Sequence, residues 1–204
     1  MFDKFKKHFQ RDNQAIAGDV AGVTTSDPMM QEFFKEIGGL SFKSGLYRTL
    51  HPTHVGDWNA RVLAAFPAFK GRILCFAYDW LGRAFALDAA RLEDKKPGVI
   101  LFEPGTGEAM EIPANLTSFH EAELIDYGDA ALAESFYRQW RASGGSPPAY
   151  DQCVGYRKPL FLGGADTVDN LETSDLDVYW HLAAQLIRKT RALPSGTPVH
   201  LNLT

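Results

Sequence analysis

Residues 72–88 read RILCFAYDWLGRAFALD, and this stretch decides the fold. Its two halves, 72–79 and 83–88, follow the two-residue period of β-strands. The DWLG segment between them begins with Asp79 and ends with Gly82, which is typical of a tight turn. The stretch therefore predicts a β-hairpin.

A second pair of strand-like runs follows, GVILFE at 98–103 and GEAMEI at 107–112. The PGTG segment between them supplies the backbone angles that a reversal needs. We therefore predict a second hairpin over residues 99–112, with its turn at Pro104 to Gly107.

This turn lies between two carboxylates, Glu103 and Glu108, so it could be an anion-binding loop, a catalytic acid pair or an ordinary turn. A phosphate-binding loop is excluded, since no lysine follows the glycines and the segment leads into a strand, not a helix. A glycosidase-like acid pair needs carboxylates that face each other across a cleft. We expect both glutamates on solvent-facing edges beside an ordinary turn.

Helical periodicity surrounds these strands. Phe2, Phe5 and Phe9 predict a short amphipathic helix in the first ten residues, and residues 11–27 are small and polar enough to predict a loop. Asp27 followed by Pro28 predicts a helix start. Further predicted elements are a strand at 45–50 and helices at 53–65, 116–125, 129–140 and from Ser174 to about residue 193.

Together these patterns predict an α+β fold, a small antiparallel sheet of hairpins packed with several helices. We expect an N-terminal helix and linker at 1–27 and one compact domain at 28–204. The 45% content of hydrophobic residues agrees with a folded globule. No apolar run spans a membrane and no secretory signal pattern begins the chain, so we expect a cytoplasmic protein.

Acidic residues are strongly segregated, although the formal net charge is only -4. Neither residues 97–137 nor residues 159–187 contain a lysine or arginine. The acids in the two windows are Glu103, Glu108, Glu111, Glu121, Glu123, Asp126, Asp129 and Glu134, then Asp166, Asp169, Glu172, Asp175 and Asp177. This pattern does not support nucleic-acid binding, which needs a basic stripe.

No group of residues predicts a catalytic or metal site. The histidines of HPTH at 51–54 lack a further converging ligand, and His120 lacks a nucleophile that the sequence can nominate. GGADTVDN at 163–170 lacks the EF-hand spacing, and Cys153 with His181 lacks a known signature context. We expect two reduced, buried cysteines and neither a cofactor nor a metal.

Several long motifs resemble, in order, the bacterial immunity proteins that neutralise DNase effectors of the type VI secretion system. They include GLYR at 45–48, CFAYDWLGRAFALD at 75–88, FEPGTGEAMEIP at 102–113, FH at 119–120, CVGYRKPLFLGGADTVDNLE at 153–172 and DVYWHLAAQL at 177–186. The likeness covers roughly residues 33–195. It implies a GAD-like part, at about 28–95 here, and a C-terminal domain of unknown function at about 96–204.

The resemblance implies a protein that binds a cognate nuclease toxin and is not an enzyme. A nuclease must present a basic surface to DNA phosphates, so segregated acids suit such a partner. We expect the contact among Glu121, Glu123, Asp126, Asp129, Asp166, Asp169 and Glu172. The alternative is a small enzyme or ligand-binding protein that uses His120, Glu103 or His181 in a pocket between sheet and helices.

Overall fold

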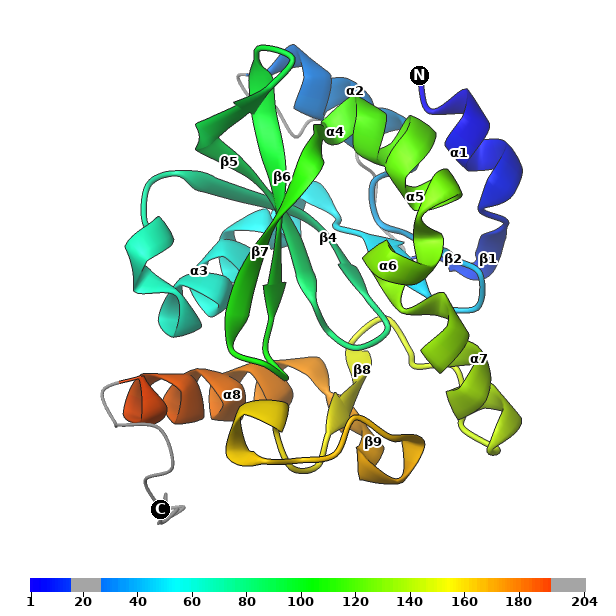
Figure 1. Cartoon of the computed structure of the whole chain (residues 1–204). Helices are drawn as coiled ribbons and strands as arrows, with labels where there is room; N and C mark the ends of the chain where they lie inside the picture. Colours follow the sequence, from blue (N-terminus) through cyan, green and yellow to red (C-terminus); the bar gives the residue numbers. More distant parts are fainter. Residues whose placement is uncertain (16–26, 192–204) are drawn as a thin grey trace.

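The computed structural model describes residues 1–15 and 27–191. Its main sheet has seven antiparallel strands, and each strand pairs with the next one in the chain (Figure 1). They are β1 (Arg11–Ala15), β2 (Leu40–Phe42), β3 (Tyr47–Thr49), β4 (Ile73–Asp79), β5 (Ala84–Glu93), β6 (Lys96–Glu103) and β7 (Glu108–Asn115). Both predicted hairpins and the α+β class are confirmed, with a larger sheet than expected.

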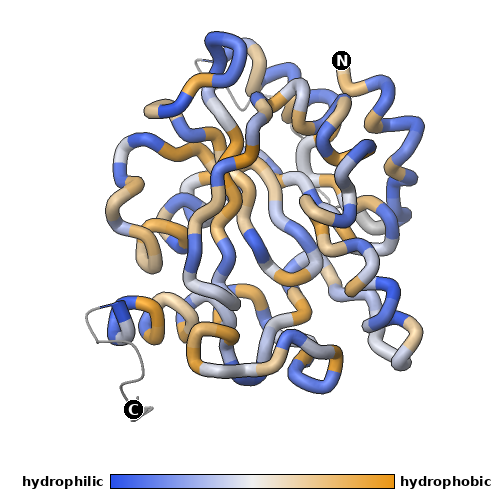
Figure 2. Tube along the Cα trace, in the orientation of Figure 1, coloured by the Kyte–Doolittle hydropathy of each residue, from blue (hydrophilic) through white to orange (hydrophobic). Residues whose placement is uncertain are grey.

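The central strands are buried on both faces. Along β6, Val99 and Leu101 join one apolar core, whereas Ile100 and Phe102 join the other. This alternation follows from the pleat, which directs successive side chains to opposite faces. Orange, apolar stretches gather in the middle of the sheet, whereas the helices alternate apolar and polar residues (Figure 2). The sheet is therefore the middle of three layers.

One face of the sheet is covered by α1 (Asp3–His8), α2 (Pro28–Ile37) and the helices that follow β7 (Figure 1). Asp27 caps α2 by accepting a hydrogen bond from the Met29 backbone N–H at 2.8 Å, as predicted. The helices after β7 are α4 (Leu116–Ser118), a π-helical segment η3 (Phe119–Glu123), α5 (Leu124–Asp126), α6 (Gly128–Leu132) and α7 (Glu134–Ala142).

The opposite face is covered by α3 (Val55–Ala65) and α8 (Leu176–Thr190). Between α7 and α8 the chain forms a separate two-stranded sheet of β8 (Gln152–Tyr156) and β9 (Leu171–Asp175). The short 3-10 turns are η1 (Pro52–His54), η2 (Pro67–Phe69), η4 (Leu160–Leu162) and η5 (Val168–Asn170). Figure 1 shows the small sheet and α8 beside the β6–β7 turn. This small sheet was not predicted.

Two predicted boundaries were wrong, and a third is not tested. Residues 11–15 pair with β2 instead of forming a loop, while residues 16–26 lie outside the described part of the chain. Asp175, not Ser174, caps the last helix, because Ser174 is paired with Cys153 in the small sheet. The predicted division near residues 95 and 96 stays a prediction; it falls at the turn between β5 and β6, which pair with each other.

The helix predicted at 129–140 is broken into α6 and α7 at Ala133, whose φ is 50°. The Trp80 indole N–H donates to the Leu132 carbonyl at 2.9 Å, and the Asp129 carboxylate accepts from the Ser135 backbone N–H at 2.6 Å. These two bonds engage backbone groups at the ends of the two helices. Tertiary contact therefore overrides the local helical pattern.

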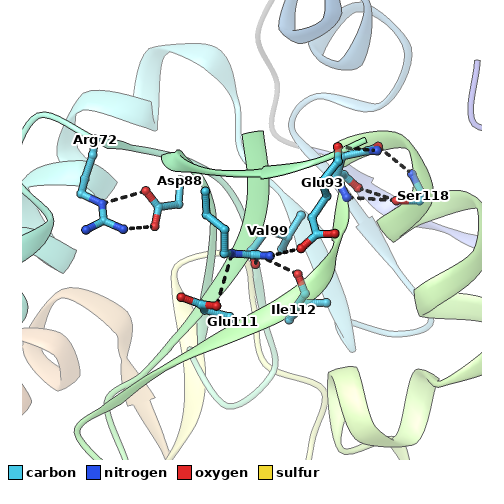
Figure 3. A network of polar contacts seen from close by, with 9 residues as sticks. Arg72, Asp88, Glu93, Val99, Glu111, Ile112 and Ser118 are labelled. Atoms are coloured by element: carbon cyan, nitrogen blue, oxygen red, sulfur yellow. Dashed lines mark hydrogen bonds and ion pairs between the residues drawn. The ribbon is translucent and has the colours of Figure 1, made fainter. Parts of the chain in front are cut away.

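An arginine stabilises the sheet where its register shifts. The ladder is irregular between Asp88 and Leu92 and again at Gly98. The Arg91 guanidinium donates to the carbonyls of Val99 and Ile112 and forms ion pairs with Glu93 and Glu111 (Figure 3). A Cβ atom on Gly98 would lie 2.6 Å from this guanidinium. A side chain at this position would displace the Arg91 guanidinium from these contacts.

Candidate functional site: an acidic groove

A groove of about 740 Å³ lies between the β6–β7 hairpin, the α6–α7 pair and the segment after β8. Its lining combines apolar and acidic side chains. The apolar members include Leu81, Leu101, Ile112, Phe136 and Leu160. The groove therefore offers both a surface for aliphatic groups and a negative potential.

Both acidic windows contribute to this groove. Its carboxylates are Glu103, Glu111, Glu123, Asp129 and Asp166, and Arg83 is the basic residue in its lining. Glu111 has a cation partner, Arg91, at 3.7 Å. The fold thus brings together acids that are distant in sequence, and most of their charge is not neutralised inside the groove.

Glu103 is the most deeply placed of these acids, with 9% of its surface exposed. The expectation that it lies on a solvent-facing edge was wrong, whereas its neighbour in the ladder, Glu108, is exposed. Burial raises the pKa of Glu103; the Arg83 guanidinium offsets part of this effect, and the negative charge of Asp79 adds to it. Its carboxylate has no hydrogen bond or ion pair with the described residues.

Arg83, the basic residue of the groove lining, already donates hydrogen bonds to other groups. Arg83 donates through Nε to the Asp79 carboxylate at 2.6 Å and through its terminal nitrogen to the Ala131 carbonyl at 3.0 Å. Asp79 also accepts from the backbone N–H groups of Leu81 and Arg83. This buried ion pair closes the β4–β5 turn. The Arg83 guanidinium therefore donates no hydrogen bond to Glu103.

Glu103 is buried because the turn after it is packed, not because the strand alone requires it. The Leu160 backbone N–H donates to the Gly105 carbonyl at 2.9 Å. A Cβ atom on Gly105 would lie 2.6 Å from the Tyr156 ring, and Gly107 has φ of 71°. The PGTG turn is confirmed, and the chain after β8 covers it.

Three of the predicted contact residues line the groove. Glu123 has a pKa raised by burial and by Asp126, and Asp166 accepts a hydrogen bond from the Tyr156 hydroxyl at 2.7 Å. The pKa of Asp129 is lowered by the hydrogen bond from the Ser135 backbone. These three acids come from η3, α6 and the loop before β9.

The other four predicted residues do not line the groove. Glu121 accepts from the backbone N–H groups of Lys4 and Phe5, at 3.4 and 3.3 Å, and so holds α1 against the body of the protein. Glu172 forms an ion pair with Arg157 at 3.5 Å. The remaining two, Asp126 and Asp169, are exposed.

The residues of the enzyme alternative do not share a cavity. His120 is fully buried, donates from Nδ1 to the Leu116 carbonyl at 2.8 Å and accepts from the Tyr47 hydroxyl at 2.9 Å. Burial lowers the pKa of His120 to about 4. His181 is exposed and lines a different groove, between α3 and α8. His120 is therefore a satisfied core residue, as the lack of a partner nucleophile indicated.

The cysteines, Cys75 and Cys153, are free and buried, as predicted. Within residues 1–15 and 27–191, no three metal-ligating side chains come together. Over the same residues, no helix has the length and apolar character to cross a bilayer.

Part of the chain is similar to a known protein family. Residues 115–187 match the family model of the T6SS immunity protein Tdi1, C-terminal. This region is similar to a type VI secretion immunity protein. It contains Glu123, Asp129, Tyr156 and Asp166 of the groove, whereas Glu103 lies before it. The immunity-like region therefore forms one wall of the groove and the main sheet forms the other.

A solved structure extends the likeness in fold. The chain resembles the crystal structure of Atu4351 from Agrobacterium tumefaciens with a TM-score of 0.63, over 91% of this chain and 89% of that chain. At 16% sequence identity this likeness shows the fold alone. The curated proteins compared contain no match.

Proposed function

We propose that this protein is an immunity protein that binds and neutralises a cognate type VI secretion DNase in the cytoplasm of the producing cell. The match of residues 115–187 to an immunity family is the observation that carries the proposal. The acidic groove supports it, since a nuclease surface that contacts DNA phosphates is basic. Inhibition would come from binding, without catalysis or a cofactor.

The seven predicted acids have a proposed role in steering. Charge of one sign on a surface accelerates encounter with an oppositely charged partner more than it deepens the final affinity. Because Glu123, Asp129 and Asp166 also line the groove, we propose that they contact the toxin, whereas the acids outside the groove act at longer range.

The test begins with the genes beside this one: any of them that encodes a nuclease-like protein supplies the candidate effector, and inhibition of that candidate effector is measured. The purified effector is mixed with plasmid DNA and increasing amounts of this protein, and DNA cleavage is followed by gel electrophoresis. We expect cleavage to stop near equimolar protein, and co-expression to restore growth of cells that carry the effector. Undiminished cleavage at a large excess of this protein would contradict the proposal.

A further inference from the structure

We propose that the acidic groove is a receptor for an arginine side chain of the protein partner, and that Glu103 is the residue that binds its guanidinium. The inference rests on the proposed function for the identity of the partner. The nature of the side chain is argued from the groove itself.

Glu103 is a buried carboxylate without a hydrogen-bond partner among the described residues. It is nine-tenths buried, lines the groove and has no hydrogen bond or ion pair with any described residue. Buried carboxylates are normally paired, because removing an ion from water is costly. Arg83 meets this need only in part: its charge attracts Glu103, but its guanidinium donates to Asp79 and the Ala131 carbonyl. The Glu103 carboxylate therefore remains open, on the groove side, to hydrogen bonds from a cation that comes from outside the chain.

The lining of the groove favours an arginine side chain over a metal ion or a lysine. No three metal-ligating side chains among the described residues approach closely enough to hold a metal ion. The apolar walls, with Leu101, Ile112 and Phe136, suit an aliphatic stem that ends in a charged head. A guanidinium also presents several donors in a plane, which matches a carboxylate in two-point contact.

Glu103 lies at a strand end whose backbone is fixed by neighbouring segments. Glu103 immediately precedes a turn whose backbone is held by Leu160 and packed against Tyr156. The carboxylate is thus carried by a strand end with little freedom to move. A rigid receptor loses less conformational entropy on binding than a flexible surface glutamate.

The test pairs Glu103→Gln with Glu108→Gln. The two glutamates are opposite each other in the β6–β7 ladder, but Glu108 is exposed. The first probe is N-acetyl-arginine amide, with the neutral isostere N-acetyl-citrulline amide as its control. Backbone amide signals of residues 103–107 are followed by NMR at probe concentrations up to about 50 mM, well above the mM range of weak binding.

We expect the arginine probe to shift these signals in the wild type and in Glu108→Gln, and to lose this effect in Glu103→Gln. Equal shifts with the citrulline probe, or no shifts with either probe, would overturn the inference whatever the toxin does.

The second probe is the candidate effector of the inhibition test. We expect Glu103→Gln to weaken binding of this effector about thirtyfold or more, the loss typical of a desolvated charge pair, with Glu108→Gln near the wild type. Equal binding by wild type and Glu103→Gln would overturn the inference and leave the proposed function intact. An effector that ignores the wild type, while the arginine probe still binds, would refute the proposed function alone.

Discussion

Two of the buried polar residues, His120 and Glu103, differ in whether their polar atoms have hydrogen-bond partners inside the protein. Around His120, a ring of aromatic side chains encloses the imidazole, and both ring nitrogens have partners inside the protein. At the acidic groove, Glu103 keeps 9% of its surface exposed, and its carboxylate has no hydrogen bond or ion pair with the described residues. A satisfied buried group contributes to stability, whereas an unsatisfied one at a groove is a place to look for a ligand.

The largest effect is expected at the ion pair below the groove. Asp79→Ala removes the carboxylate that Arg83 binds and leaves a buried cation uncompensated. We expect the free energy of unfolding to fall by about 3 to 5 kcal/mol, measured by urea denaturation. A loss below about 1 kcal/mol would mean that water reaches Arg83. Glu103→Gln, which removes no internal partner, should be far milder and serves as the comparison.

The next effect is a pH dependence from the His120 site. The pKa of His120 is about 4 in the folded protein, below the usual 6.5, because burial disfavours the imidazolium. The unfolded chain therefore binds the proton more readily between these values. The stability contribution is complete above pH 6.5 and is lost as the pH falls towards 4, by about 3 kcal/mol in total.

His120→Gln keeps a donor and an acceptor at this site but does not titrate. Urea unfolding of both proteins from pH 4 to pH 7 should show that the variant lacks this part of the slope. The same slope in both proteins would show that other groups cause the acid sensitivity.

A smaller effect is expected at the turn beside the groove. Gly105→Ala would place a Cβ atom 2.6 Å from the Tyr156 ring, and we expect a loss of about 2 kcal/mol from overpacking. Gly56→Ala is the matched control, since its Cβ would meet nothing within 4 Å and the position is helical. Thermal unfolding should show the control unchanged or up to about 1 kcal/mol more stable. Similar losses in both variants would contradict the packing argument.

The smallest effect concerns steering. One variant reverses Glu123, Asp129 and Asp166 to lysine, and the other reverses Asp126, Asp169 and Glu172. We expect both to slow association with the candidate effector by roughly tenfold at low salt, less at high salt, and only the first also to speed dissociation. Stopped-flow mixing across ionic strength measures both rates. Association that responds to neither salt nor reversal would show that these acids serve solubility.

Much of the architecture could be predicted, because it depends on local patterns. The two-residue period of 72–88 and 98–112, the turns at Asp79–Gly82 and Pro104–Gly107, and the Asp27 cap of α2 are all present. Hydrogen bonds to distant parts of the chain decided the exceptions. The Trp80 indole, which donates to the Leu132 carbonyl where the helix is interrupted at Ala133, lies about fifty residues earlier, so the pattern of residues 129–140 does not contain this contact.

The candidate site shows the same division. The sequence by itself determined which residues carry the charge, because the two lysine-free and arginine-free windows are a property of composition. Only the tertiary structure decided which of these acids meet. It turned Glu121 towards α1, grouped Glu123, Asp129 and Asp166 along one groove, and buried Glu103 where a regular hairpin would expose it. The physical reason is that the burial and pairing of a carboxylate depend on the residues that pack against it. At the end of β6 these residues are Tyr156 and Leu160, about fifty positions further along the chain.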